Sequence, residues 1–153
     1  MPVNKTHIII HHSASADHTT HVNFQAIRDY HVNINKWRDV GYNFVIDRIN
    51  GRPEVFVGRM LTEDGAHTVE LSLNKVGVGI CLVGNFDQDQ PSSDSLELMA
   101  RLCKSMMEQF CIPPENVLGH WEAQAMGGVP IAKRKTCPGL KFSMDEFRKR
   151  LKS

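Results

Sequence analysis

Apolar positions along this chain follow two different periods, and their alternation predicts a layered fold of strands and helices. Residues 8–10 form a β-branched run that is typical of a buried strand. Residues 76–83 are apolar on both alternating faces, which predicts a central strand covered on both sides. Residues 117–119 indicate another short strand, which ends just before His120.

A hairpin is expected between residues 44 and 57. The apolar triplets 44–46 and 55–57 flank Asn50-Gly51, a dipeptide that favours a tight turn because glycine tolerates a positive φ. Residues 59–75 show no clear period, so we interpret them as an irregular surface loop.

The first helix is expected over about residues 23–35. Its apolar side chains recur at intervals of three and four residues, which is the spacing of one helical face. They are Phe24, Ile27, Tyr30 and Ile34.

Two further helices carry N-terminal capping signals. Asp94 and Glu97 match a capping box, after which apolar side chains line one helical face as far as Phe110. The last helix opens at Ser143, with Glu146 three residues later. The elements predict an α/β (α+β) fold in three layers, with a central mixed sheet of about five strands and helices on both faces.

Length and charge limit the number of domains and the classes of binding partner that we expect. A chain of 153 residues with 41% hydrophobic content suits one compact domain over residues 1–153. Lys and Arg number 18 against 17 Asp and Glu, so no single-sign field would draw the chain to nucleic acid or an anionic membrane. No secretory signal opens the sequence, and no apolar stretch approaches the ~20 residues that span a bilayer. We expect a cytoplasmic monomer without membrane insertion.

The four cysteines form no CxxC pair, and free thiols are expected. Cys81 lies in an apolar strand and Cys103 on an apolar helix face, so both are interpreted as core residues, and Cys111 is assigned to the core as well. Cys137 differs, because its turn-rich setting with basic neighbours favours a thiolate.

Three good zinc donors stand at positions where a cleft could form. His11 and His120 each follow a predicted buried strand, and Cys137 occupies a later turn. Two histidines and one cysteine make three protein ligands, which is the pattern of a catalytic zinc site with one open position. The spacing alone also allows ordinary core or surface histidines, since no local metal motif such as HExxH is present.

An ordered set of short motifs extends from about residue 6 to residue 150. They are Ile10-His11-His12-Ser13-Ala14, Trp37-Arg38-Asp39-Val40-Gly41-Tyr42-Asn43-Phe44, Gly65-Ala66-His67, Asn74, Val78-Gly79-Ile80, His120-Trp121-Glu122 and Lys135-Thr136-Cys137-Pro138-Gly139. Together they resemble the N-acetylmuramoyl-L-alanine amidase family, which includes small phage lysozymes of amidase type and the animal peptidoglycan recognition proteins. Each motif is modest by itself, but the ordered set is specific.

The resemblance implies one zinc ion held by His11, His120 and Cys137, with Tyr42 and Lys135 as catalytic partners. Zinc would lower the pKa of a water from ~15.7 toward ~7. Lys135 would neutralise an oxyanion, and Tyr42 would orient the water, donate to the oxyanion or pass a proton to the leaving nitrogen. Without the resemblance, Tyr42 is a structural aromatic residue and Lys135 belongs to a solvated basic turn.

Secondary positions also follow from the resemblance. His67 and Asn74 lie on a loop that borders the family's substrate groove, where they either bind substrate or stabilise the loop. His12 and Glu122 are candidates for residues that surround the metal ligands, where Glu122 could orient a histidine. His31 is interpreted as structural, and His7, His18 and His21 as surface residues.

This sequence departs from the family pattern at two places. Asn43 stands where relatives commonly have histidine, and residues 78–83 lack the acidic residue that some relatives carry there. The second departure shifts the expected catalytic burden toward Tyr42 and zinc.

The implied function is hydrolysis of the amide between N-acetylmuramic acid and L-alanine of peptidoglycan, as in a phage-type endolysin that lyses bacteria. A cytoplasmic amidase that recycles soluble muropeptides is one alternative, and a non-catalytic peptidoglycan-binding protein is another.

Overall fold

The computed structural model describes residues 2–15 and 23–153, so the predictions for His18 and His21 lie outside the described residues. The strands are β1 (His7–His12), β2 (Phe44–Ile49), β3 (Arg52–Val57), β4 (Gly77–Leu82) and β5 (Val117–Gly119). The α-helices are α1 (Asn23–Asp29), α2 (Leu73–Val76), α3 (Ser93–Phe110), α4 (His120–Met126) and α5 (Met144–Leu151). A π-helical turn, η1, spans Tyr30–Ile34, and 3-10 turns span Glu70–Ser72 (η2), Pro114–Asn116 (η3) and Ile131–Lys133 (η4).

One mixed sheet organises these elements in the order β3-β2-β4-β1-β5. Strands β2, β4, β1 and β5 are parallel neighbours, and β3 pairs antiparallel with β2. The predicted hairpin is confirmed, with Asn50 and Gly51 at φ 51° and 81° in its turn. Strand β4 is central and buried along its whole length, as its two apolar faces predicted.

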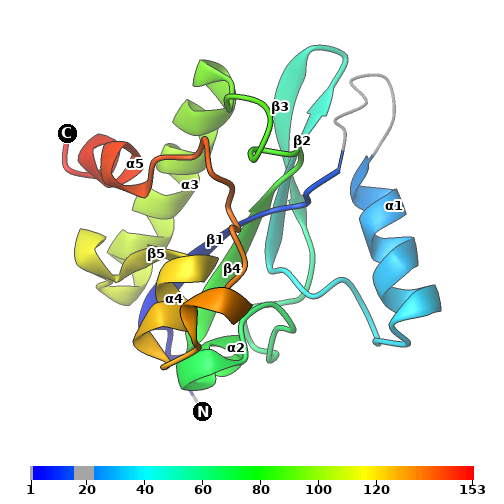
Figure 1. Ribbon diagram of the computed structural model, residues 1–153, viewed down its shortest axis with the longest axis horizontal. Helices are drawn as coiled ribbons and strands as arrows, with labels where there is room; N and C mark the ends of the chain where they lie inside the picture. The colour runs from blue at the N-terminus through cyan, green and yellow to red at the C-terminus, as the bar shows by residue number, and fades with distance from the viewer. Residues whose placement is uncertain (1, 16–22) are drawn as a thin grey trace.

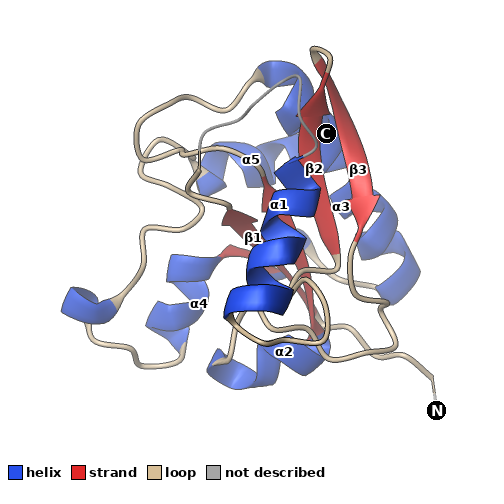
Figure 2. Ribbon diagram, turned by 90° about the vertical axis from the view of Figure 1, so that its right-hand side faces the viewer, coloured by secondary structure: helices blue, strands red, loops and turns tan. Residues whose placement is uncertain are grey.

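Helices cover both faces of the sheet (Figures 1 and 2). On one face, the side chains of Ile8 and Ile10 pack in one cluster with Met99 of α3 and Phe147 of α5. On the other face, Ile9 packs with residues of α2 and α4, and Val45 and Cys81 pack with residues of α1. The predicted three-layer α/β architecture is therefore confirmed.

The first helix differs from its prediction. Regular α-helix ends at Asp29, and the π-helical turn η1 follows. A π-helical turn has more residues per turn, so it rotates later side chains away from the apolar face. Tyr30 and Ile34, predicted on that face, are exposed, while Phe24 and Ile27 pack on the sheet.

Two other local predictions were wrong. Residues 59–75 are not wholly irregular, because they contain η2 and the start of α2, whose Leu73 is buried. The capping box at Asp94 and Glu97 does not form, since α3 begins one residue before Asp94 and the Asp94 carboxylate instead pairs with both terminal nitrogens of Arg48 at 2.8 Å. The cap at the last helix is confirmed, because Ser143 Oγ accepts a hydrogen bond from Glu146 N at 3.2 Å.

The cysteines are free thiols, and three of the four are buried. Cys81 and Cys103 lie in the core as predicted. Cys111 is exposed, contrary to its prediction, because it ends α3 in the left-handed conformation with φ 56° and leaves the helix face.

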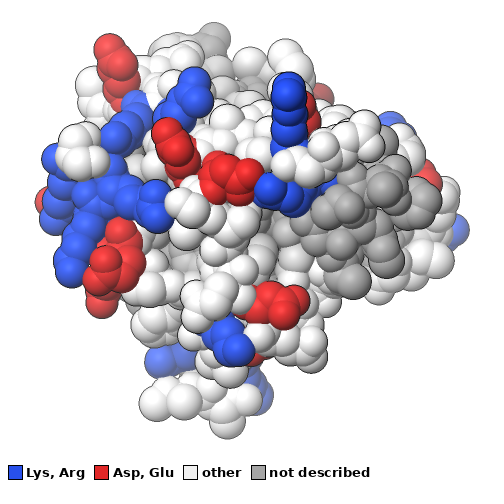
Figure 3. Space-filling model, turned by 90° about the horizontal axis from the view of Figure 1, so that it is seen from above, with Lys and Arg blue, Asp and Glu red and all other residues white. Residues whose placement is uncertain are grey.

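Charges on the surface are mixed in sign. Figure 3 shows acidic and basic side chains interspersed over one face, with Lys and Arg gathered toward the side on which Figure 1 places α5. The last turn of α5 carries Arg148, Lys149 and Arg150. None of the helices in the described ranges has the length and apolar character needed to cross a membrane.

Candidate metal centre

Strand register brings two of the candidate ligands together. Strands β1 and β5 are parallel neighbours, with Ile10 opposite Gly119. The next residue of each segment is a histidine, and the rings of His11 and His120 have their centroids 4.7 Å apart. His120 is also the first residue of α4, so its ring projects where the chain turns from strand to helix.

Cys137 reaches the same place from a loop held by hydrogen bonds. Its carbonyl oxygen accepts from Trp121 N at 2.9 Å, and its Sγ accepts from His12 N at 3.3 Å. The Asp87 carboxylate accepts from Thr136 Oγ1 and from Leu140 N, both at 2.9 Å. The sulfur is therefore fixed beside β1 although 125 residues separate Cys137 from His12.

The donor atoms of His11, His120 and Cys137 all lie within 4.8 Å of one another. His11 Nδ1 is 3.6 Å from Cys137 Sγ. Tetrahedral zinc with Zn–N near 2.0–2.1 Å and Zn–S near 2.3 Å would separate these atoms by about 3.5 Å. Both the donor types and their spacing fit a zinc ion.

Burial sets the electrostatics of the three groups. It lowers the pKa of His120 to about 4 and lowers that of His11 well below 6.5, so both imidazoles are neutral and can act as ligands at neutral pH. Burial also raises the pKa of the Cys137 thiol to about 12, although the His12 N–H and the Lys135 ammonium act to lower it. The basic neighbours therefore do not create a thiolate by themselves, and a cation must replace the thiol proton.

His67 lies directly behind His11. Its Nδ1 is 3.2 Å from His11 Nε2 and 2.9 Å from Thr68 Oγ1. The ring is packed so closely against Gly65 and Gly79 that a Cβ at either glycine would meet it at 2.6 Å or less. Although His67 borders the cavity, its contacts favour a role in orienting His11.

Asn74 stabilises the loop that carries His67. Its Oδ1 accepts hydrogen bonds from the backbone N–H groups of His67 and Thr68, both at 2.7 Å. Of the two roles considered for Asn74, these contacts support the structural one.

Tyr42 and Lys135 line the same cavity as the three donors, with a volume of about 870 Å³. The Tyr42 ring lies 5.1 Å from that of His11, and burial raises its pKa well above 10. Lys135 is exposed, and its backbone N–H donates to Gln124 Oε1 at 2.7 Å. Its positive charge contributes, after burial, to the lowered pKa of His120.

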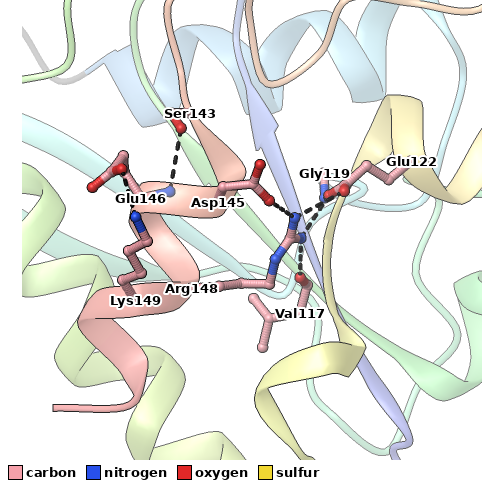
Figure 4. A network of polar contacts seen from close by, with 8 residues as sticks. All are labelled: Val117, Gly119, Glu122, Ser143, Asp145, Glu146, Arg148 and Lys149. Carbon is pink, nitrogen blue, oxygen red and sulfur yellow. Dashed lines mark hydrogen bonds and ion pairs between the residues drawn. The ribbon is translucent and has the colours of Figure 1, made fainter.

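Glu122 and His12 serve the framework around the site. Glu122 accepts hydrogen bonds from Gly119 N at 2.9 Å and from two nitrogens of Arg148 at 2.8 and 3.0 Å, and Figure 4 shows its carboxylate turned to α5. None of the contacts found in the described residues joins it to a histidine ring. The His12 Nδ1 accepts from Phe86 N at 3.1 Å, so His12 supports Cys137 through its backbone.

Two other positions have structural explanations. His31 Nδ1 accepts from Gly41 N at 3.0 Å, in agreement with its structural interpretation. Asn43, which stands where relatives commonly have histidine, is fully buried and joins the Arg59 carbonyl oxygen to Gly79 N. Its side chain therefore connects β4 to the segment that follows β3.

Glu70 was missed by the sequence analysis. Its Oε2 is 3.8 Å from His120 Nε2, and both side chains are nearly buried. It is the only acidic residue between positions 65 and 83, and this isolation was the available signal.

Comparisons with known proteins identify relatives of this chain in sequence and in fold. One peptidoglycan-recognition protein of Drosophila melanogaster is 29% identical over 147 residues, which cover 93% of this chain and 72% of that protein. A second from the same species, the SC1a protein, is 28% identical over 78% of this chain, and the match spans 65% of its own length.

Solved structures share the fold. Bumblebee PGRP-SA superposes with a TM-score of 0.74 at 28% identity, covering 100% of this chain and 83% of that one. The amidase LysC of Clostridium intestinale gives a TM-score of 0.75 at 22% identity, covering 97% and 86%, and this likeness concerns the fold alone. Residues 2–140 match the family described as N-acetylmuramoyl-L-alanine amidase. Since that match spans most of the sequence and all three candidate ligands, this chain belongs to the N-acetylmuramoyl-L-alanine amidase family.

Proposed function

We propose that this protein is a zinc-dependent amidase that hydrolyses the bond between N-acetylmuramic acid and L-alanine of peptidoglycan. The observation that carries the proposal is the convergence of His11, His120 and Cys137 within 4.8 Å of one another, in the cavity that Tyr42 and Lys135 also line. Three protein donors, rather than four, are typical of catalytic zinc.

A zinc ion bound there supplies a Lewis acid for the scissile carbonyl and lowers the pKa of water from ~15.7 toward ~7. The exposed Lys135 ammonium neutralises negative charge that develops on the carbonyl oxygen. Tyr42 keeps its proton at neutral pH because burial raises its pKa, so it acts as a hydrogen-bond donor. The buried imidazole of His67 holds His11 in place.

Two roles in the cell are compatible with this chemistry. An endolysin would cut intact wall and lyse bacteria, whereas a recycling amidase would act on soluble muropeptides. We favour the endolysin, and its expected signature is faster release of peptide amino groups from intact sacculi than from soluble fragments. A preference for soluble fragments would favour recycling instead.

Binding without hydrolysis is a second candidate function, because the two Drosophila relatives described above are peptidoglycan-recognition proteins. One structural neighbour, PGRP-LE, was solved in complex with tracheal cytotoxin, a monomeric peptidoglycan fragment. Cys137, Tyr42 and Lys135 favour hydrolysis here, since a protein that only binds has no use for this donor set.

The deciding experiment compares the unaltered protein with Cys137→Ala. We expect about one zinc per chain and chelator-sensitive amide hydrolysis in the unaltered protein, and loss of both in the variant. Cys111→Ser is the matched control, because it removes an exposed thiol that does not line the cavity. Fragment binding with no hydrolysis in the zinc-loaded protein would establish the second function.

Lys135→Ala separates metal binding from catalysis. We expect this variant to keep its zinc and to lose about 10²–10³-fold in kcat, the usual effect of removing an oxyanion-stabilising group. Normal hydrolysis by the variant would return Lys135 to a solvated basic turn.

A further inference from the structure

Glu70 is a nearly buried carboxylate with an unused oxygen. Its side chain is 13% exposed, and its Oε2 has no hydrogen-bond partner among the described residues. Burying an ionised carboxylate without a partner is costly. The ionisable group that faces it is the His120 ring, whose Nε2 lies 3.8 Å from Oε2.

The two residues that follow Glu70 have an uncommon backbone conformation. Leu71 and Ser72 both adopt the left-handed conformation, with φ of 55° and 59°. Such conformations cost free energy in residues other than glycine and persist where the surrounding structure enforces them. The stem of Glu70 also packs on Gly127 at the end of α4, where an added Cβ would lie 2.9 Å from Glu70 Cβ.

Residues 67–68, which lie shortly before Glu70 in the chain, contact the ring of the other candidate histidine ligand, His11. His11 turns Nδ1 toward Cys137 Sγ at 3.6 Å and Nε2 toward His67 and Thr68 at 3.2 and 3.3 Å. One ring nitrogen therefore faces the metal site and the other faces residues 67–68. At His120, Nε2 faces Glu70, three residues after His67 on the same loop.

We propose that Glu70 is a positioning residue of the metal centre, whose carboxylate accepts a hydrogen bond from His120 Nε2–H. This fixes the tautomer and leaves Nδ1 as the metal-binding nitrogen of His120, and it rests on the zinc site proposed above. Histidine ligands commonly donate their second N–H to a carboxylate in this way. A movement of about 1 Å by either side chain turns the contact into a charge-assisted hydrogen bond of about 2.8 Å.

The charge balance of the site supports this role. A divalent cation with one thiolate and two neutral imidazoles keeps one positive charge in a nearly buried place. The Glu70 carboxylate offsets that charge without joining the group of converging donors, which contains only His11, His120 and Cys137 among the described residues. Glu122 does not supply this charge, because it is bonded to Arg148.

Zinc affinity, measured by competition with a chromophoric chelator, tests the proposal. We expect Glu70→Ala to bind zinc about 10–100-fold more weakly, and Glu70→Gln to recover part of the loss because an amide oxygen still accepts a hydrogen bond. Glu63→Ala is the matched control. Its carboxylate lies at the same 3.8 Å from Arg38, but that pair is exposed, so no change is expected.

A spectroscopic readout separates positioning from a general structural effect. Long-range ¹H–¹⁵N spectra of the zinc-loaded protein should show His120 protonated at Nε2, and this resonance should shift in Glu70→Ala while the His11 signals stay in place. If Glu70→Ala and Glu70→Gln both bind zinc as tightly as the unaltered protein, and the His120 Nε2–H resonance is unchanged, the proposal is overturned. If the unaltered protein binds no zinc, the proposed function itself fails and this inference fails with it.

Discussion

Two carboxylates close to the start of α4, those of Glu70 and Glu122, differ in what they contact. Glu122, two residues after His120, belongs to what we name the Glu122 cluster: Glu122, Arg148, Asp145 and the backbone of Val117 and Gly119. Glu70, fifty residues before His120 in the chain, faces the His120 ring with an oxygen that accepts no hydrogen bond from the part of the chain that the structure describes. Proximity in the sequence to the candidate ligand His120 pointed to Glu122, whereas proximity in the structure points to Glu70.

The difference shows that two carboxylates near the start of α4 have different roles, one in the stability of the fold and the other at the candidate metal centre. Glu122 accepts hydrogen bonds from the backbone N–H of Gly119 and from the guanidinium of Arg148. These bonds connect β5, α4 and α5 (Figure 4). Glu70 Oε2 accepts no hydrogen bond among the described residues, so this oxygen remains available to the His120 ring. The first carboxylate should therefore affect unfolding, and the second should affect metal binding.

Removing the Glu122 carboxylate should have the largest effect on stability. Glu122→Ala leaves Arg148, whose side chain is 18% exposed, with one carboxylate fewer and leaves the Gly119 N–H without its acceptor. We expect a loss of about 2–4 kcal/mol in the free energy of unfolding. Urea denaturation in the presence of chelator measures it.

The paired variant sharpens the contrast. Glu70→Gln should leave the free energy of unfolding in chelator unchanged or slightly increased, because it removes a nearly buried charge whose Oε2 has no hydrogen-bond partner among the described residues. A large destabilisation by Glu70→Gln, comparable to that of Glu122→Ala, would show that the two carboxylates do not differ as argued.

A fall in pH from 7 to 5 should lower the folding stability through the buried histidines of the candidate metal centre. The Glu122 cluster should not contribute to this loss, because its contacts include no histidine. The folded-state pKa values of His67 and His120 are lowered to about 3 and about 4, below the unfolded value of 6.5. The unfolded chain therefore binds more protons below pH 6.5, and stability present at neutral pH is lost as the pH falls toward 4. Each histidine contributes a loss of about 2 kcal/mol between pH 7 and pH 5.

Unfolding in chelator at several pH values checks this expectation. His67→Gln should remove one of these contributions from the slope, whereas Glu122→Ala should leave the slope unchanged. A stability profile that is flat between pH 7 and pH 5 would contradict the neutral, buried state of both imidazoles.

The smallest effect is expected from the ion pair between Lys149 and Glu146 within α5. The Lys149 ammonium lies 3.0 Å from the Glu146 carboxylate, and both side chains are largely exposed, at 72% and 71%. Figure 4 draws this contact on the outer side of α5. Solvent screens such pairs, so Lys149→Ala should change the free energy of unfolding by less than about 0.5 kcal/mol. A larger change would mean that exposure does not explain the difference between Lys149 and Arg148.

Local patterns predicted much of the framework. The apolar runs gave β1, β4 and β5, Asn50-Gly51 gave the hairpin, and Ser143 gave the last helix cap. These features depend on the preferences of neighbouring residues, which the sequence contains directly. The local pattern failed at Asp94, because its carboxylate accepts hydrogen bonds from Arg48, a residue distant in the chain, and does not form the predicted capping box.

The sequence by itself determined the candidate donors, His11, His120 and Cys137, and the two strands near them, β1, which contains His11, and β5, which ends just before His120. Only the tertiary structure decided that β5 lies beside β1 in the register that aligns these histidines, and that Glu70 rather than Glu122 faces His120. The physical reason is that strand order and outer contacts depend on how helices bury both faces of the sheet. That packing joins residues far apart in the chain, and no local pattern encodes it.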